Sequence, residues 1–169
     1  MALQIFKIAE VTVASPQANI EFTSIPSGYT DLKVVLSART VVDCAFALRF
    51  NGNSANYSGR VLRGDGSVTA SYLVTDYGAF GSTAMGLGYI ENESDTFASG
   101  EIYIPNYTSS NNKSVSVENM QEKNATNPVY LTVTAGLWSN ASAITSITFV
   151  PDSSTSFTAY STATLYGIL

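Results

Sequence analysis

Histidine is absent from this sequence, and cysteine occurs only once. Without histidine, neither a Ser-His-Asp triad nor a Cys-His pair can form, and most zinc sites lose a ligand. Cys44 has no partner for an intrachain disulfide, and its strand-like surroundings (VVDCAF, residues 41–46) predict a small buried hydrophobic residue. These absences argue against an enzyme, and we expect no cofactor.

Basic residues are also few. The chain has eight Lys and Arg against thirteen Asp and Glu, a net charge of −5, and the basic residues form no cluster. Because neutralising phosphates requires clustered Lys and Arg, we expect no nucleic-acid partner. No apolar run reaches the roughly 18 residues of a membrane span. Residues 1–7 (MALQIFK) lack the charged start and long apolar core of a signal peptide. We therefore expect a non-membrane protein with nothing that marks it for export.

Strand-forming and turn-forming residues dominate the composition, with ten Tyr, eight Phe and abundant Ser and Thr. Alternation of apolar and polar residues predicts a half-buried first strand over residues 4–13, with Ile5, Ala9, Val11 and Val13 on one face. Further strands are expected at residues 19–22, 31–39, 44–50, 57–63, 68–74, 97–104, 114–120, 129–137, 144–150 and 157–168. Many short strands and no helical periodicity indicate an all-β protein, a single-domain antiparallel β-sandwich of the jelly-roll type over residues 1–169.

Turn chemistry separates the expected strands. Gly64-Asp65-Gly66 predicts a hairpin between residues 57–63 and 68–74. The glycine-rich segment 78–88 is interpreted as a loop, and no lysine follows it as a phosphate-binding loop would require. We therefore interpret it as a contact loop or a mobile lip.

Carboxylates provide two weak candidate sites. Glu101 and Glu118 lie on neighbouring predicted strands, as a glycosidase pair would, but the same alternation places them equally well on a solvated face. Glu91, Glu93 and Asp95 form the densest acidic cluster, a solvated loop whose oxygens offer calcium binding as the alternative. The cluster lacks the glycine and the closing glutamate of an EF-hand.

Aromatic residues are the remaining candidates for contact with a partner, because exposed Tyr and Trp stack on sugars and anchor protein interfaces. Trp138 lies at the end of a predicted strand, and its side chain is equally compatible with a position in the core and one at the rim. Tyr77, Phe80 and Tyr89 flank or lie in the glycine-rich segment, and we count them as candidate contacts.

Six phrases of the sequence together resemble a known family. They are IEFTSIP (20–26), YTDL (29–32), LRFNG (48–52), EIYIPNY (101–107), AGLWS (135–139) and YSTATLYGI (160–168). The chain resembles structural proteins of tailed-bacteriophage virions, frequent in phages of aquatic bacteria, from about residue 5 to residue 169. The resemblance implies a capsid decoration or cement protein, made in the host cytoplasm and located on the capsid exterior. It transfers no catalytic motif.

A decoration role implies the major capsid protein as partner. Because such proteins often occupy three-fold positions, we expect a homotrimer. Residues 1–6 are a candidate contact strand through Leu3, Ile5 and Phe6, and the alternative is an ordinary first strand of the sheet. The competing function is a carbohydrate-binding or adhesin module of a phage tail fibre or baseplate, with Trp138 and the Tyr-rich loops contacting a surface glycan.

Overall fold

The computed structural model describes residues 3–73, 82–94, 96–123, 129–152 and 154–169, and in that part of the chain no helix occurs. The strands there are β1 (Ile5–Thr12), β2 (Ile20–Phe22), β3 (Asp31–Ala38), β4 (Cys44–Phe50), β5 (Tyr57–Gly64), β6 (Thr69–Leu73), β7 (Met85–Ile90), β8 (Ala98–Ile104), β9 (Lys113–Met120), β10 (Leu131–Trp138), β11 (Ile147–Pro151) and β12 (Thr162–Ile168). Each predicted strand overlaps an observed one. Among the described residues there is accordingly no helix of the kind that crosses a membrane.

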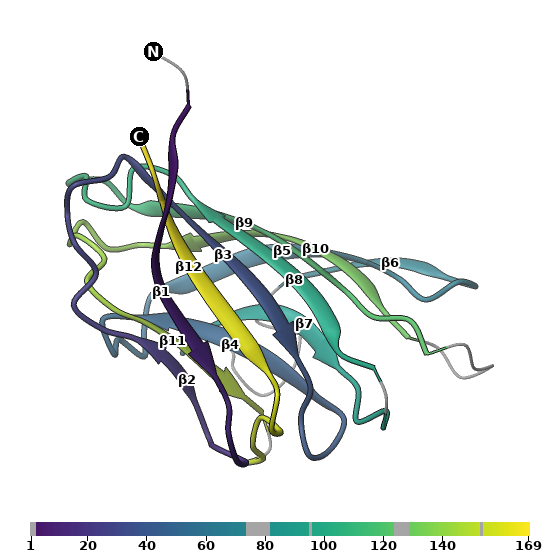
Figure 1. Cartoon of the computed structure of the whole chain (residues 1–169). Coiled ribbons are helices and arrows are strands. Elements are labelled where there is room, and N and C mark those ends of the chain that lie inside the picture. The colour runs from purple at the N-terminus through teal and green to yellow at the C-terminus, as the bar shows by residue number, and fades with distance from the viewer. Residues whose placement is uncertain (1–2, 74–81, 95, 124–128, 153) are drawn as a thin grey trace.

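The strands form two sheets that pack face to face (Figure 1). The larger sheet has eight strands in the order β1-β12-β3-β8-β9-β10-β5-β6, and the smaller has four in the order β2-β11-β4-β7. Neighbouring strands pair antiparallel in both sheets. The predicted antiparallel β-sandwich is therefore confirmed, and the arrangement is consistent with a jelly roll.

The inner faces of the two sheets supply the hydrophobic core. In β3 the alternation is strict, because Leu32, Val34 and Leu36 are buried while the residues between them face outward. Phe46 and Phe149 of the smaller sheet belong to the same buried cluster. Burying each side chain of this size stabilises the fold by about 1.5–3 kcal/mol.

Trp138 belongs to this core, with 1% of its surface exposed. Its indole stacks on the ring of Tyr57 at a centroid distance of 6.2 Å and lies 5.5 Å from Phe50. The Tyr57 hydroxyl accepts a hydrogen bond from the Phe50 amide at 2.8 Å and donates one to the Asn53 carbonyl at 3.2 Å. The sequence allowed either a core or a rim position for Trp138, and the structure places it in the core. The prediction that Trp138 is an exposed contact residue was therefore wrong.

The interpretation of segment 78–88 as a loop was wrong for residues 85–88. Residues 78–81 lie outside the described residues, but Met85–Ile90 form β7, which pairs with β4. The Met85 side chain occupies the space beside Gly136 of β10, where a Cβ would overlap its sulfur. Glycine at position 136 thus permits close packing between the sheets.

The first strand departs from the predicted alternation. β1 pairs with β12, and an extra residue at Ile8 shifts the register between Lys7 and Ala9. A bulge of one residue exchanges the two faces of the strand. Ile5 is therefore exposed instead of sharing the inward face with Ala9 and Val11, which pack against the core.

Candidate functional site

Strand β10 shows an inverted polarity. Thr132 and Thr134 are buried, with exposed fractions of 0% and 1%, whereas Leu131 and Val133 are exposed at 52% and 42%. A strand with one solvated face ordinarily directs its apolar residues toward the core. Trp138 lies on the same face as the two threonines, and because alternate residues of a strand share a face, burying Trp138 directs Leu131 and Val133 outward.

Neighbouring strands extend this feature across the outer surface of the larger sheet. Val133 lies opposite Leu62 of β5, and Leu131 lies opposite Met120 of β9. Leu62 and Met120 are themselves 50% and 40% exposed. We call Leu62, Met120, Leu131 and Val133 the outer-face patch. A contiguous group of exposed apolar side chains, unlike a single one, marks a surface that binds another molecule.

Charged residues flank the outer-face patch on both sides. Glu118 of β9 lies opposite Val133, and Arg60 of β5 lies opposite Ala135. Both side chains are exposed, and among the described residues neither takes part in an ion pair. Within the part of the chain that the structure describes, the patch is therefore bordered by an anion and a cation that have no ion-pair partner.

The proposed carboxylate pair lies on the same outer face. Glu101 of β8 is directly opposite Glu118, and both are exposed. Lys33 of β3 forms an ion pair with Glu101 at 2.6 Å. This pairing offsets the charge of Glu101, whereas Glu118 forms no ion pair with any described residue. The two carboxylates stand on a solvated sheet surface, as the second interpretation of the sequence expected.

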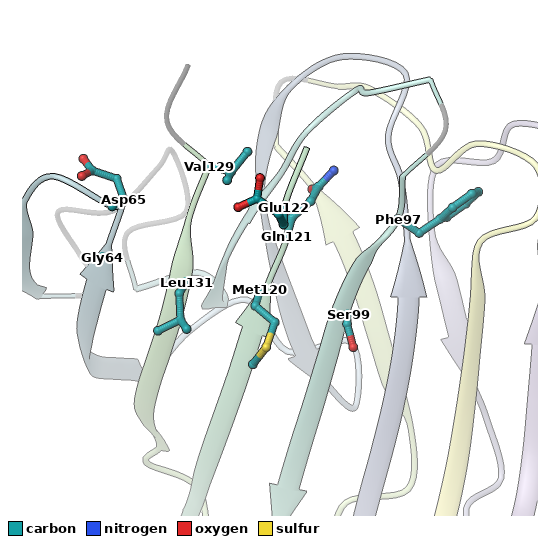
Figure 2. A pocket seen from close by; sticks show the side chains of 10 residues that line it. Gly64, Asp65, Phe97, Ser99, Met120, Gln121, Glu122, Val129 and Leu131 are labelled. Carbon is teal, nitrogen blue, oxygen red and sulfur yellow. The ribbon is translucent and has the colours of Figure 1, made fainter. Parts of the chain in front are cut away.

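One end of the outer-face patch opens into a groove of about 620 Å³ (Figure 2). Met120 and Leu131 form its floor at the ends of β9 and β10, the β5–β6 turn borders one side and Phe97 stands on the other. Its lining consists of Gly64, Asp65, Gly66, Phe97, Ser99, Met120, Gln121, Glu122, Val129 and Leu131. The turn is the hairpin predicted from Gly64-Asp65-Gly66, and β5 and β6 pair as expected.

Asp65 and Gln121 of the groove form hydrogen bonds within the protein that fix the walls of the groove. The Asp65 carboxylate accepts hydrogen bonds from the Val68 and Ser67 amides at 2.7 and 2.9 Å, which lowers its pKa. The Gln121 amide accepts from the Glu91 N–H at 2.9 Å and donates to the Thr96 hydroxyl at 3.1 Å. The carboxylates of Asp65 and Glu122 line the groove together with apolar side chains, and this lining suits apolar or cationic groups.

The candidate contacts at the N-terminal end are exposed. Leu3, Ile5 and Phe6 have exposed fractions of 72%, 53% and 42%. The Phe6 ring contacts Tyr29 at a centroid distance of 6.0 Å, and Ile5 borders a shallow hollow with Val35 and Tyr166. The N-terminal end of β1 projects past the body of the sandwich beside the C-terminus (Figure 1). This segment is thus both an edge strand of the sheet and an accessible apolar surface.

Of the predicted aromatic contacts, the structure describes Tyr89 and Trp138. Tyr77 and Phe80 lie outside the described residues, and Trp138 is buried. Tyr89 is half-buried and meets Tyr130 edge to face at 5.5 Å, and burial raises its pKa. Arg63 stacks on Tyr130 at 4.3 Å, so this aromatic pair already has a cationic neighbour.

In the described part of the acidic cluster, Glu91 and Glu93 both pair with a lysine. Lys123 binds Glu91 at 3.3 Å and Glu93 at 3.2 Å, and its side chain is 7% exposed. Burial raises the pKa of Glu91, although the hydrogen bond from Lys123 opposes that shift. Asp95 lies outside the described residues, and among those described no group of three or more acidic, Cys or His side chains is arranged to hold a metal ion.

Comparison with known proteins identifies no family. No family model and no curated protein matches the chain. Peanut lectin in complex with a nine-residue peptide (PVIWSSATG) is a solved structure with some similarity, at a TM-score of 0.22 and 6% sequence identity, covering 99% of this chain and 92% of the lectin chain. A likeness at this level does not indicate a shared ligand.

Proposed function

We propose that this protein is a structural component of a bacteriophage virion, a decoration or cement protein on the capsid exterior that acts without catalysis. The resemblance of its sequence to virion structural proteins supports the phage assignment. A β-sandwich with a continuous core suits a protein that stabilises a shell through contacts alone.

The observation that carries this proposal is the outward-facing apolar face of β10. Leu131 and Val133 are exposed although threonines occupy buried positions in the same strand. A sheet face of this kind suits association with protein, because each Å² of apolar surface that becomes buried stabilises the complex by about 25 cal/mol. Catalysis would instead need reactive groups gathered in a cleft.

The N-terminal end of β1 is the second proposed contact, directed at the major capsid protein. Leu3, Ile5 and Phe6 are exposed there, and the unpaired edge of β1 offers backbone groups for a further strand. Three copies around a three-fold capsid position would match the symmetry of the shell. We propose this trimer for the capsid-bound protein.

The first test is the copy number per virion, measured by quantitative mass spectrometry against the major capsid protein. A decoration role predicts hundreds of copies in simple proportion to the capsid subunit. A few dozen copies would place the protein on the tail, and complete absence from the virion would refute the proposal.

Attachment can be tested with substitutions that leave the core intact. The Leu3→Ser/Ile5→Ser variant should lose binding to capsids that lack the protein, as measured by co-sedimentation. Val42→Ser is the matched control, because Val42 is also exposed, at 46%, and lies outside β1. Unchanged binding of the double variant would exclude this end as the capsid contact.

The adhesin function loses its main support, since the Trp138 ring is covered by the core. Phe97 beside the groove is the aromatic residue that would replace it, but the Arg39 guanidinium lies over its ring at 4.9 Å. We expect no specific binding in a glycan array. Specific binding that Phe97→Ala removes would support the adhesin instead.

A further inference from the structure

We propose that the outer-face patch is a self-association surface through which two copies of this chain pair around a two-fold axis, with Glu118 of each copy facing Arg60 of the other. This inference concerns the free protein and does not depend on the virion assignment. It rests on the register of three neighbouring strands and on the charges at their outer face.

The first step is the position of the two charges. Glu118 lies one strand to one side of β10, opposite Val133, and Arg60 lies one strand to the other side, opposite Ala135. With strands about 4.8 Å apart, β10 separates the two residues by about 10 Å across the sheet. They are arranged symmetrically about the point on β10 between Val133 and Ala135.

The second step is that neither charge has an ion-pair partner among the described residues. Glu118 faces a like charge, Glu101, whose own partner is Lys33 at 2.6 Å. Like charges directly opposite each other on neighbouring strands are destabilising. Arg60 donates a hydrogen bond only to its neighbour's carbonyl, Gly59, at 3.2 Å among the contacts of the described residues. An opposite charge on a partner molecule would therefore stabilise each of these two residues.

The third step is the symmetry operation. A two-fold axis that lies in the interface, crosses β10 between Val133 and Ala135 and runs perpendicular to the line joining Glu118 and Arg60 exchanges the positions of these two residues. When a second sheet packs on the first by this operation, Glu118 meets Arg60 twice, and Leu62 of each copy lies over Val133 of the other. An isologous contact of this type uses one surface on both copies and closes as a dimer. A second copy thus covers Leu62 and Val133 and pairs both charges.

The test is the mass of the purified protein by light scattering and sedimentation equilibrium. The wild-type chain of 17.9 kDa should form a concentration-dependent dimer. Glu118→Lys and Arg60→Glu, each alone, place like charges together twice and should weaken association at least about tenfold. The double variant Glu118→Lys/Arg60→Glu restores opposite charges and should recover the dimer.

Two controls accompany these variants. Glu21→Lys makes the same charge change on β2 of the other sheet and should leave the dimer intact. Val133→Ser tests the apolar part and should also weaken association, while circular dichroism confirms that the variants fold. A monomer at millimolar concentration, a trimer in solution, or a double variant that stays dissociated would each overturn the proposed contact.

Discussion

The indole of Trp138 stacks on the ring of Tyr57 with an interplanar angle of 16°, at the point where the last residue of β10 pairs with the first residue of β5. This contact fixes which face of β10 is inward. The same pairing therefore places the outer-face patch on the surface.

Trp138→Ala should lower the free energy of unfolding by about 3–5 kcal/mol, because it leaves a cavity in the core. Trp138→Phe should cost less, since the indole N–H has no hydrogen-bond partner among the described residues and its loss leaves no acceptor unpaired. Urea unfolding followed by circular dichroism measures both changes. Tyr160→Ala, at a residue that is 77% exposed, is the control and should be nearly neutral. Equal stability of Trp138→Ala and wild type would contradict the core position.

Gly136→Ala should destabilise the protein by about 1–3 kcal/mol, because the added Cβ overlaps the Met85 side chain between the two sheets. Gly28→Ala adds the same methyl group where no atom lies within 4 Å and should have little effect. Thermal unfolding of the two variants makes the comparison. If both lose the same stability, backbone effects rather than the contact between Gly136 and Met85 are responsible.

Asp65→Asn should weaken the β5–β6 hairpin, and the loss should depend on pH. Amide hydrogen bonds hold the pKa of Asp65 below its ordinary value of 3.8 in the folded state. A lowered carboxyl pKa contributes stability above the unfolded-state value, and that stability is lost as the pH falls through the folded-state value. The melting temperatures of wild type and variant should therefore differ at pH 7 and converge in acid. A constant difference would rule out the carboxylate charge as the cause.

Lys123→Met should destabilise the protein by about 1–3 kcal/mol at pH 7, because the carboxylate of Glu91, 9% exposed, loses its cation. Burial raises the pKa of Glu91 above its ordinary value of 4.5. A raised carboxyl pKa gives stability that is full below the unfolded-state value and is lost as the pH rises through the folded-state value. The deficit of the variant should consequently shrink in acid, where Glu91 is protonated.

Lys7→Met is the control for this variant, since the Lys7–Glu10 pair is exposed on both sides, at 59% and 46%. It should change stability by less than about 1 kcal/mol. The two lysine variants are compared by urea unfolding at pH 7 and in acid. A Lys123→Met deficit that grows in acid would contradict the role given to Glu91.

The sequence predicted the fold class well because local signals and tertiary structure agree in most strands. In β3, β8 and β12 a period of two in apolar residues coincides with the buried face. Gly64-Asp65-Gly66 specified its hairpin through turn chemistry alone. The strand β7 was missed because its glycines weaken strand propensity. At Gly88 the glycine is required by tertiary structure, since φ is +134° and an added Cβ would lie 2.9 Å from the Asn119 side chain.

The outer-face patch could not be predicted from local sequence patterns. In segment 131–138 the face of Leu131, Val133 and Leu137 is the more apolar one, and Trp138 is the one large apolar residue on the other face, so a period of two favours burying the wrong face. The sequence by itself determined that this segment is a strand, since alternation and β-propensity are properties of neighbouring residues. Only the tertiary structure decided that Trp138 goes inward and that Leu131 and Val133 face outward between Glu118 and Arg60. The physical reason is that burial and cross-strand pairing are set by residues distant in the chain, here Tyr57, Phe50 and Met85, whose contacts outweigh the local pattern.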